Sequence, residues 1–310
     1  MSKNKNFQGI IPPMLTSFTK EGDLYEEGIR NCVDFLIEHG VHGFWALGSI
    51  GMGPYMRIEE RKKAAEIIID QVNGRIPIIV HVGSTATRDC VELAKHAQEA
   101  GADAVSIVPP YYFPPNFEEL KEHYSFIVEK IDIPVIIYNN PSVCGFNITP
   151  QQAAELAKIK GIIGIKDTTS DLTHFYGCIK YCREVKKDFT LLYANSKLAT
   201  LGLIIGAHGV IPGLANVLPE LYVKIYENVI QNKFKEALEI QQKIISVESV
   251  FRQPRITALF EALKIRGCNV GFPRRPLFPE ASEDTRQKIK PHLKHLISYN
   301  LNPNYLSHSK

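Results

Sequence analysis

The chain has 310 residues, 45% of them hydrophobic, and a formal net charge of +3. Its hydrophobic content is ordinary for a globular protein, and its length suits one large barrel, since (β/α) barrels run to about 250 residues and more. The small positive charge is spread along the chain, which favours neither nucleic acid nor a membrane surface as a partner.

The amino-terminal residues and the cysteines indicate a cytoplasmic protein. The start, MSKNKNFQG, has no apolar segment of the signal-peptide type. The six cysteines include no CxxC pair, which is typical of reduced thiols. His174, Cys178 and Cys182 share one helix face, where a metal site is the alternative to packing. No fourth ligand is evident, so we expect a packed face and no metal.

Eight short apolar runs recur along the chain, separated mostly by longer amphipathic stretches. The runs are Ile10–Phe18, Gly43–Gly48, Pro77–Gly83, Ala104–Pro109, Pro134–Asn140, Ile162–Thr168, Thr190–Asn195 and Gly209–Gly213. The stretches include Ile58–Val72, Asp89–Ala100, Phe117–Lys130, Thr149–Ile159 and Leu172–Val185. Runs that are apolar throughout suit a parallel sheet covered by helices. The pattern predicts an α/β fold, a (β/α)8 TIM barrel.

Local signals mark several helix ends. Thr149 followed by Pro150 predicts a helix start, Asp171 predicts another, and Gly101 predicts a helix end. The charge-free segment Leu198–Leu218 is long enough for a membrane span, but its glycines and Pro212 favour helix, turn and buried strand.

Beyond the last apolar run the pattern becomes helical. It extends from Leu218 to about His295, with a break near Gly267–Pro279. We therefore expect a barrel over residues 1–225 and a small C-terminal helical region over residues 226–310.

Barrel enzymes carry their active sites at the carboxyl ends of the strands, and Lys166 stands at one such end. It follows the apolar residues Ile162–Ile165, and lysine is among the residues least often buried. A desolvated amine has a lowered pKa and can attack a carbonyl to form a Schiff base. A lysine that reaches the rim, or that pairs with Asp167, is an equally open interpretation at this point.

Tyr138 ends the preceding run, in PVIIYNNP. Its hydroxyl lies within reach of Lys166 if the two runs are neighbouring strands, and it could then transfer protons. The alternative is a tyrosine that closes the top of the barrel. Gly48, Ser49, Ile50 and Gly51 form a turn that lacks nucleotide-binding spacing and better suits backbone N–H groups facing a carboxylate.

Together these motifs resemble the class I pyruvate-dependent aldolases and lyases of the N-acetylneuraminate lyase/dihydrodipicolinate synthase superfamily. The likeness runs from about Gly9 to Leu277. It is carried, in the family's order, by GIIPPMLTSF, GSIGMG, PPYYFP, IIYNNPSVCG, GIKDT and GAHGVIPGLANVLPE.

The resemblance implies a role for each matching residue. It makes Lys166 the Schiff-base lysine, Tyr138 the catalytic tyrosine and Ser49 a carboxylate-binding and proton-relay hydroxyl. It makes Tyr112 a tyrosine that a neighbouring subunit contributes, which implies a homotetramer. We also expect substrate contacts from Gly48, Ile50, Gly51, Thr168, Asn195 and Ile211. The resemblance implies no cofactor, because the imine itself is the electron sink.

Two departures from the family pattern bear on the substrate. The family's turn usually reads G-[ST]-[ST]-G-E, whereas this chain has Ile50 and Met52 at the second hydroxyl and the glutamate positions. Dihydrodipicolinate synthases carry an arginine where this chain has Val143. The first departure implies that pyruvate is bound more weakly or in a different arrangement, and the second argues against dihydrodipicolinate synthase. The Gly51–Pro54 turn, PYYFP and the pairing of Val143 with Gly145 look like the 2-keto-3-deoxy sugar acid aldolases, which release pyruvate and an aldehyde.

Three alternatives stay open from the sequence. Dihydrodipicolinate synthase and N-acetylneuraminate lyase would use the same imine on other substrates. A barrel that binds a keto acid as a regulatory protein, without turnover, is the non-enzymatic alternative. Retention of both Lys166 and Tyr138 weighs against it.

Overall fold

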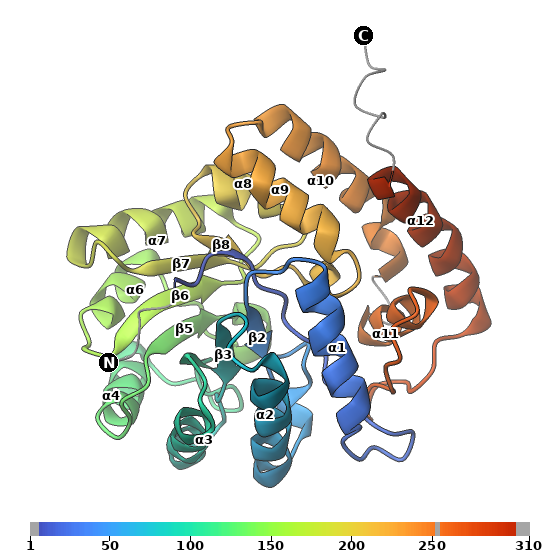
Figure 1. The fold of residues 1–310 in the computed structure, drawn as a ribbon. Coiled ribbons are helices and arrows are strands. Elements are labelled where there is room, and N and C mark those ends of the chain that lie inside the picture. The colour runs from blue at the N-terminus through green and yellow to red at the C-terminus, as the bar shows by residue number, and fades with distance from the viewer. Residues whose placement is uncertain (1–5, 252–254, 302–310) are drawn as a thin grey trace.

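The computed structural model describes residues 6–251 and 255–301, and its strands form one parallel sheet (Figure 1). The strands are β1 (Gly9–Ile10), β2 (Phe44–Ala46), β3 (Ile78–His81), β4 (Ala104–Ile107), β5 (Val135–Asn139), β6 (Ile162–Asp167), β7 (Thr190–Tyr193) and β8 (Gly209–Val210). Each strand pairs with the next in sequence from β2 to β8, and β8 pairs with β1.

The sheet closes between β1 and β2 through a bridge from Pro13 to Trp45. The Met14 N–H donates to the Trp45 carbonyl, and the Trp45 N–H donates to the Pro12 carbonyl, both at 3.0 Å. The expected (β/α)8 barrel is confirmed.

The first strand is shorter than the predicted run Ile10–Phe18. Only Gly9–Ile10 pairs regularly, because Pro12 and Pro13 have no N–H to donate to a ladder. The rest of that run crosses the end of the barrel as an irregular segment.

Helices cover the outside of the sheet. They are α1 (Glu26–Glu38), α2 (Ile58–Val72), α3 (Thr87–Ala100), α4 (Phe117–Val128), α5 (Pro141–Cys144), α6 (Pro150–Ala157), α7 (Leu172–Val185), α8 (Ala199–Ile204) and α9 (Pro219–Ile230). The predicted ends are confirmed: the Thr149 and Asp171 side chains accept N–H bonds from the first turns of α6 and α7. Gly101 ends α3 in the left-handed conformation, with φ of 96°.

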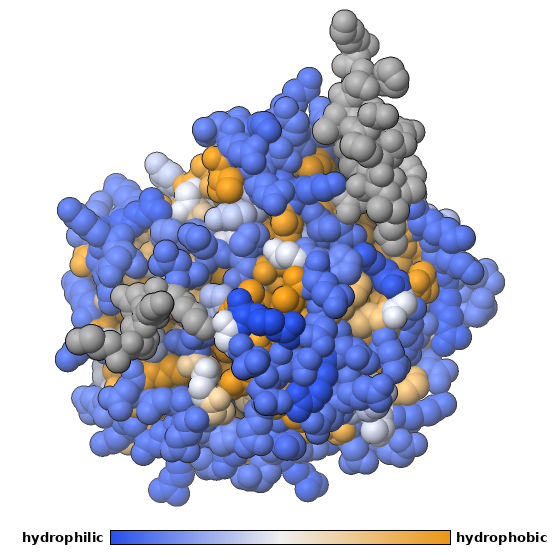
Figure 2. Space-filling view, in the orientation of Figure 1, coloured by the Kyte–Doolittle hydropathy of each residue, from blue (hydrophilic) through white to orange (hydrophobic). Residues whose placement is uncertain are grey.

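Two apolar clusters result from the alternation of side chains along the strands. One fills the barrel and includes Trp45, Ile136, Tyr138, Leu192 and Ile211. The larger cluster lies between strands and helices. In the view of Figure 2 the surface is mainly hydrophilic, with hydrophobic side chains in small separate patches.

The last described helices are α10 (Phe234–Glu248), α11 (Arg255–Ile265) and α12 (Glu283–Leu301). Helix α10 packs against α9, and α12 packs against α11 (Figure 1). The break between α11 and α12 falls where the sequence predicted it. The expected boundary after residue 225 falls inside α9 and stays a prediction.

Leu198–Leu218 contains α8, β8 and the short 3-10 helix η2 (Gly213–Asn216), as its glycines indicated. Within the described parts of the chain, no helix has the length and apolar character that a membrane span requires.

Candidate active site

Lys166 faces the barrel interior in the regular upper half of β6, above a bulge low in that strand. Val135 pairs with Ile162 but Ile136 pairs with Gly164, so Ile163 is an extra residue. A Cβ on Gly164 would lie 2.6 Å from the Thr190 carbonyl oxygen, which explains the glycine. Above the bulge the register is regular and places Lys166 directly opposite Tyr138.

The Lys166 amine is enclosed by aromatic rings. The residue is 3% exposed, and Nζ lies 4.0 Å from the Tyr138 ring centroid and 4.2 Å from that of Trp45. Burial holds the pKa of the amine well below its usual range. The neutral form, which is the nucleophile, is therefore favoured.

Asp167 faces the opposite way, toward the helices. It accepts bonds from Asn139 Nδ2 at 2.9 Å and Thr169 Oγ1 at 2.6 Å, and His174 Nδ1 lies 3.3 Å from its Oδ2. The carboxylate is thus fully engaged behind the strand. Lys166 therefore neither reaches the rim of the barrel nor pairs with Asp167.

The same contacts account for the His174 face of α7. His174 Nε2 lies 3.0 Å from the Ile148 carbonyl oxygen, and Cys178 and Cys182 are buried. Among the described residues, no group of three or more His, Cys, Asp or Glu side chains could hold a metal ion. This face of α7 packs against the body of the protein.

Tyr138 is 4% exposed and is held from several sides. Asn140 Nδ2 donates to its hydroxyl at 2.9 Å, and its ring meets those of Trp45 and His81 edge-on at 5.3 and 5.4 Å. Burial raises the pKa of the phenol, while the neighbouring polar side chains of Ser49, Asn140 and Thr168 lower it. Ser49 and Thr168 therefore lie beside the phenol.

The Thr168 hydroxyl is close to Tyr138 but has no hydrogen bond of good geometry to any described residue, although it is buried. A hydroxyl that is near the phenol can shift its pKa, but a hydrogen bond also requires good alignment of donor and acceptor. The Thr168 hydroxyl lacks that alignment and is unpaired. A buried hydroxyl normally has a partner. A substrate oxygen would supply one.

The Gly48–Gly51 turn closes the site from β2. A Cβ on Gly51 would lie 2.8 Å from the Met14 carbonyl oxygen, so only glycine fits. Leu47 and Met52, which flank the turn, have φ of 58° and 57°, a left-handed conformation that costs energy in residues with a side chain. The N–H groups of residues 48 to 51 donate to no other group in the described chain, and so are free for an anion.

The two departures in this turn differ in their surroundings. Met52 is fully buried, and its sulfur accepts a bond from the Arg274 N–H at 3.4 Å. Ile50 is half-buried beside Gly213, in the loop after β8. Ile50, rather than Met52, therefore adjoins the site.

The remaining expected site residues lie at varying distances from Lys166. Ile211 is in the interior cluster. Asn195, in the loop after β7, donates to Ser170 Oγ in the loop after β6 at 3.1 Å and accepts the Lys197 N–H at 2.9 Å. Tyr112 is 78% exposed and packs edge-on against Phe113, with ring centroids 5.0 Å apart. The structure brings Gly48, Ser49, Ile50, Gly51, Tyr138, Lys166, Thr168 and Ile211 together, but leaves Tyr112 outside.

Sequence reasoning missed two neighbours of the site. Trp45 points inward from β2, in a run that is apolar throughout and so does not show which residues face the interior. Arg61 reaches over from α2, where it is 5% exposed and donates to the carbonyls of His81 at 2.8 Å and Gly83 at 3.1 Å. It holds the end of β3, and no strand pattern could have revealed it.

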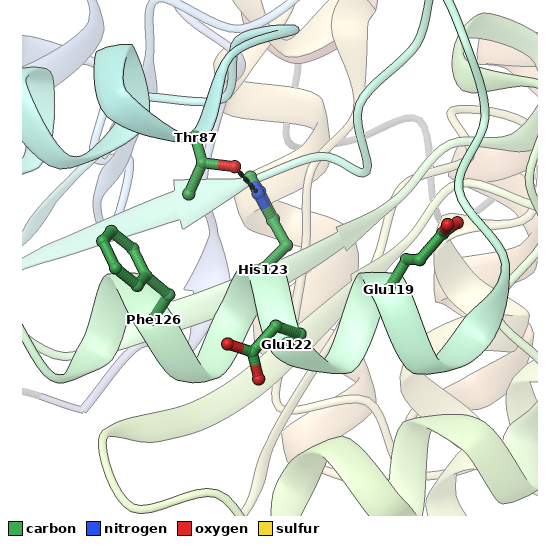
Figure 3. A pocket seen from close by; sticks show the side chains of 5 residues that line it. All are labelled: Thr87, Glu119, Glu122, His123 and Phe126. Atoms are coloured by element: carbon green, nitrogen blue, oxygen red, sulfur yellow. Dashed lines mark hydrogen bonds between the residues drawn. The ribbon is translucent and has the colours of Figure 1, made fainter.

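A hollow between α3 and α4 lies on the outer wall and contains none of the expected site residues (Figure 3). Thr87 Oγ1 lies 2.9 Å from His123 Nδ1, and Phe126 borders the same space. Burial lowers the pKa of His123 to about 4.

A profile of the "Dihydrodipicolinate synthetase family" matches residues 6–296. The 4-hydroxy-tetrahydrodipicolinate synthase of Methanopyrus kandleri is 36% identical over 292 residues, 93% of this chain and 96% of that protein. An Escherichia coli K12 protein described as probable 2-dehydro-3-deoxy-D-pentonate aldolase YjhH is 32% identical over 288 residues, covering 92% and 96%.

Solved structures agree with these sequence matches. YagE from E. coli K12, a dihydrodipicolinic acid synthase family protein solved with pyruvate, has a TM-score of 0.90 at 30% identity, covering 94% of this chain and 99% of that one. CdNal from Clostridium difficile, solved with mannosamine, has a TM-score of 0.89 at 28% identity, covering 94% and 100%.

Proposed function

The chain belongs to the dihydrodipicolinate synthetase family of class I pyruvate-dependent aldolases and lyases, and we propose that it cleaves a 2-keto-3-deoxy sugar acid to pyruvate and an aldehyde. The observation that carries the proposal is the buried amine of Lys166 directly opposite Tyr138. A desolvated lysine beside a proton-transferring hydroxyl is what Schiff-base chemistry requires.

In the proposed reaction, Lys166 Nζ attacks the C2 carbonyl to give a carbinolamine, and the Tyr138 phenol gives its proton to the departing hydroxyl, so that water and an iminium form. Tyr138, now the phenolate, takes the proton of the C4 hydroxyl, and the C3–C4 bond breaks. Its electrons pass into the iminium to give an enamine, and the aldehyde leaves. The Tyr138 proton then returns to C3 of the enamine, and water releases pyruvate and the free amine.

Two groups would hold the substrate during these steps. The free N–H groups of the Gly48–Gly51 turn and the Ser49 hydroxyl would bind the keto-acid carboxylate. The unpaired Thr168 hydroxyl would bond a substrate hydroxyl. Ile50 offers an N–H but no hydroxyl, so carboxylate binding loses one hydrogen bond.

Dihydrodipicolinate synthase is the second candidate, favoured by the name of the Methanopyrus relative. Against it stands Val143, which is 47% exposed on α5 and offers neither charge nor donor where such synthases carry an arginine. The name of YjhH supports the sugar acid assignment instead.

Assembly and location belong to the same proposal. The exposed aromatic pair of Tyr112 and Phe113 suits contact with another subunit, and we propose a homotetramer in which Tyr112 reaches a neighbouring site. We propose a cytoplasmic location, supported by six buried free thiols.

Borohydride reduction with pyruvate, followed by peptide mass mapping, tests the imine. We expect an adduct on Lys166 and none in Lys166→Met. The absence of an adduct on any lysine of the wild-type protein would overturn both the aldolase and the synthase assignments. The remaining candidate would then be a regulatory protein that binds a keto acid without turnover.

Substrate screening then separates the candidates. Pyruvate release is measured from 2-keto-3-deoxy sugar acids and N-acetylneuraminate, and pyruvate consumption with aspartate semialdehyde. Efficient consumption of pyruvate with the semialdehyde would show that Val143 does not exclude the synthase reaction.

A further inference from the structure

Arg255, the first residue of α11, reaches the mouth of the barrel from a distant part of the chain. A Cβ placed on Gly213 would lie 3.0 Å from Arg255 Nη2 and 2.7 Å from Ile50 Cδ1. The guanidinium and the Ile50 side chain therefore flank the same glycine, in the loop after β8. Ile50 is next to Ser49, so the guanidinium lies on the β2/β8 side of the candidate active site.

The charge of Arg255 is not neutralised by the parts of the chain that the structure describes. The residue is exposed, and it makes no ion pair or hydrogen bond to any described residue. Lys197, another cation at this rim, pairs with Glu248 at 3.2 Å. An arginine without a carboxylate partner at the mouth of a site is available to a substrate anion.

Tyr222 independently places Arg255 at this rim. Burial raises the pKa of the Tyr222 phenol, and the nearby Ser196 side chain and the positive charge of Arg255 oppose that rise. The Tyr222 hydroxyl donates to the Ser196 carbonyl at 3.1 Å, in the loop after β7. Arg255 is thus close to the loops after β7 and β8 as well as to Ile50.

Two unpaired hydroxyl groups lie in the same site as the Lys166 amine and the Arg255 guanidinium. Thr168 Oγ1, beside Tyr138, and Ser196 Oγ are both buried and have no hydrogen-bond partner in the described chain. Buried hydroxyls without partners are costly, and the hydroxyl groups of a substrate would satisfy them. The site therefore offers an amine, free hydroxyls and a guanidinium.

We propose that Arg255 is a specificity-determining residue that binds a second carboxylate at the far end of the substrate, so that the substrate is a dicarboxylic 2-keto-3-deoxy sugar acid. The planar guanidinium matches a carboxylate with two parallel hydrogen bonds. Arg255 thus places a positive charge on the opposite side of the mouth from Val143, the position where dihydrodipicolinate synthases carry an arginine. This inference rests on the proposed aldolase function.

The test compares two substrates that differ only at the terminal carbon, a hydroxymethyl group in one and a carboxylate in the other. The variants are Arg255→Gln, Arg255→Lys and the control Arg88→Gln, an exposed arginine of α3 that lines the outer hollow between α3 and α4. We expect wild-type enzyme to prefer the diacid. Arg255→Gln should lower kcat/KM for the diacid about 10- to 100-fold and for the monoacid by less than about threefold, as for one lost charged hydrogen bond.

Arg255→Lys should retain part of the preference, because a lysine keeps the charge but not the fork. Arg88→Gln should leave both substrates unchanged, and unaltered melting temperatures would confirm folding. Equal losses for both substrates in Arg255→Gln, or no wild-type preference for the diacid, would overturn the inference.

Imine trapping with pyruvate separates this inference from the function on which it rests. A pyruvate adduct on Lys166 in wild type and in Arg255→Gln, without a diacid preference, overturns the role of Arg255 alone. Absence of the adduct in wild type overturns the aldolase function.

Two further substrates test whether Arg255 binds an anionic group other than the second carboxylate of a sugar diacid. Condensation of aspartate semialdehyde that falls in Arg255→Gln, without diacid cleavage, would assign the carboxylate to that aldehyde and overturn the diacid substrate. A preference for a terminal phosphate ester over the diacid would overturn carboxylate recognition.

Discussion

The two sides of the barrel mouth are built differently. On the β5/β6 side, Tyr138 and Lys166 lie on paired strands, and their positions follow from strand register. On the β2/β8 side, Ile50 sits in a turn flanked by left-handed residues, and Arg255 arrives from α11. The first side matches the family motifs and the second departs from them. Regular strands thus position the proposed chemistry, and turns and a distant helix adjust what it acts on.

The largest expected effect comes from Lys166→Met. Removing the nucleophile should lower kcat by about 10⁴-fold or more. Stability should hold or rise, since a buried amine without an ion pair is replaced by an apolar side chain of similar length. Steady-state kinetics and thermal unfolding measure both. Lys158→Met, on the surface, is the control. Substantial activity in Lys166→Met would show that Lys166 is not the nucleophile.

Tyr138→Phe tests the second member of that side. Loss of the proton-transferring hydroxyl should lower kcat by about 10²- to 10⁴-fold, while the pyruvate adduct on Lys166 still forms. Tyr193→Phe is the control, because it too removes a buried tyrosine hydroxyl, one without a partner in the described chain, and its ring packs on Phe175 behind the sheet. Equal losses in both variants would point to packing instead of proton transfer.

Ile50→Thr tests the opposite side. A hydroxyl restored beside the turn should lower KM for pyruvate by about tenfold, the lower range for one hydrogen bond to a charged group. Ile50→Val controls for the change in volume without adding a donor. A KM that shifts equally in both variants would show that side-chain size, and not hydrogen bonding, controls binding at this turn.

The smallest effect concerns the network behind β6. Bonding to Asp167 raises the pKa of His174, since the charged ring can donate to both Asp167 and the Ile148 carbonyl. A raised native pKa stabilises the fold below the unfolded pKa of about 6.5, and the gain is lost as pH rises through the native pKa. His174→Ala should therefore lower Tm by about 1–3 °C more at about pH 5.5 than at about pH 8.5.

His42→Ala is the control of opposite sign for that experiment. Burial lowers the pKa of His42, whose neutral ring accepts the Ile10 N–H at 3.1 Å. Its deletion should cost more at high pH. The same pH trend in both variants would show that Asp167 does not govern the behaviour of His174.

The sequence predicted the barrel and the β5/β6 side well, because both depend on short-range patterns. Continuous apolar runs indicate buried parallel strands, and residues at strand ends converge whatever the loops do. Pro12 and Pro13 shortened β1 for a reason visible in the sequence. Arg61 and Arg255 could not be found this way, since where a helix side chain reaches depends on how the helix packs across a long sequence separation.

The unpaired residue in β6 also sets how far that strand tolerates changes in length. Loss of Ile163 would leave a regular ladder with Lys166 still opposite Tyr138, because Ile136 already pairs with Gly164. Loss of Ile165 would instead turn the amine toward the helices and bring Asp167 into the barrel. The strand can therefore lose a residue below Gly164 without moving Lys166 from its place opposite Tyr138, but it cannot lose one above Gly164.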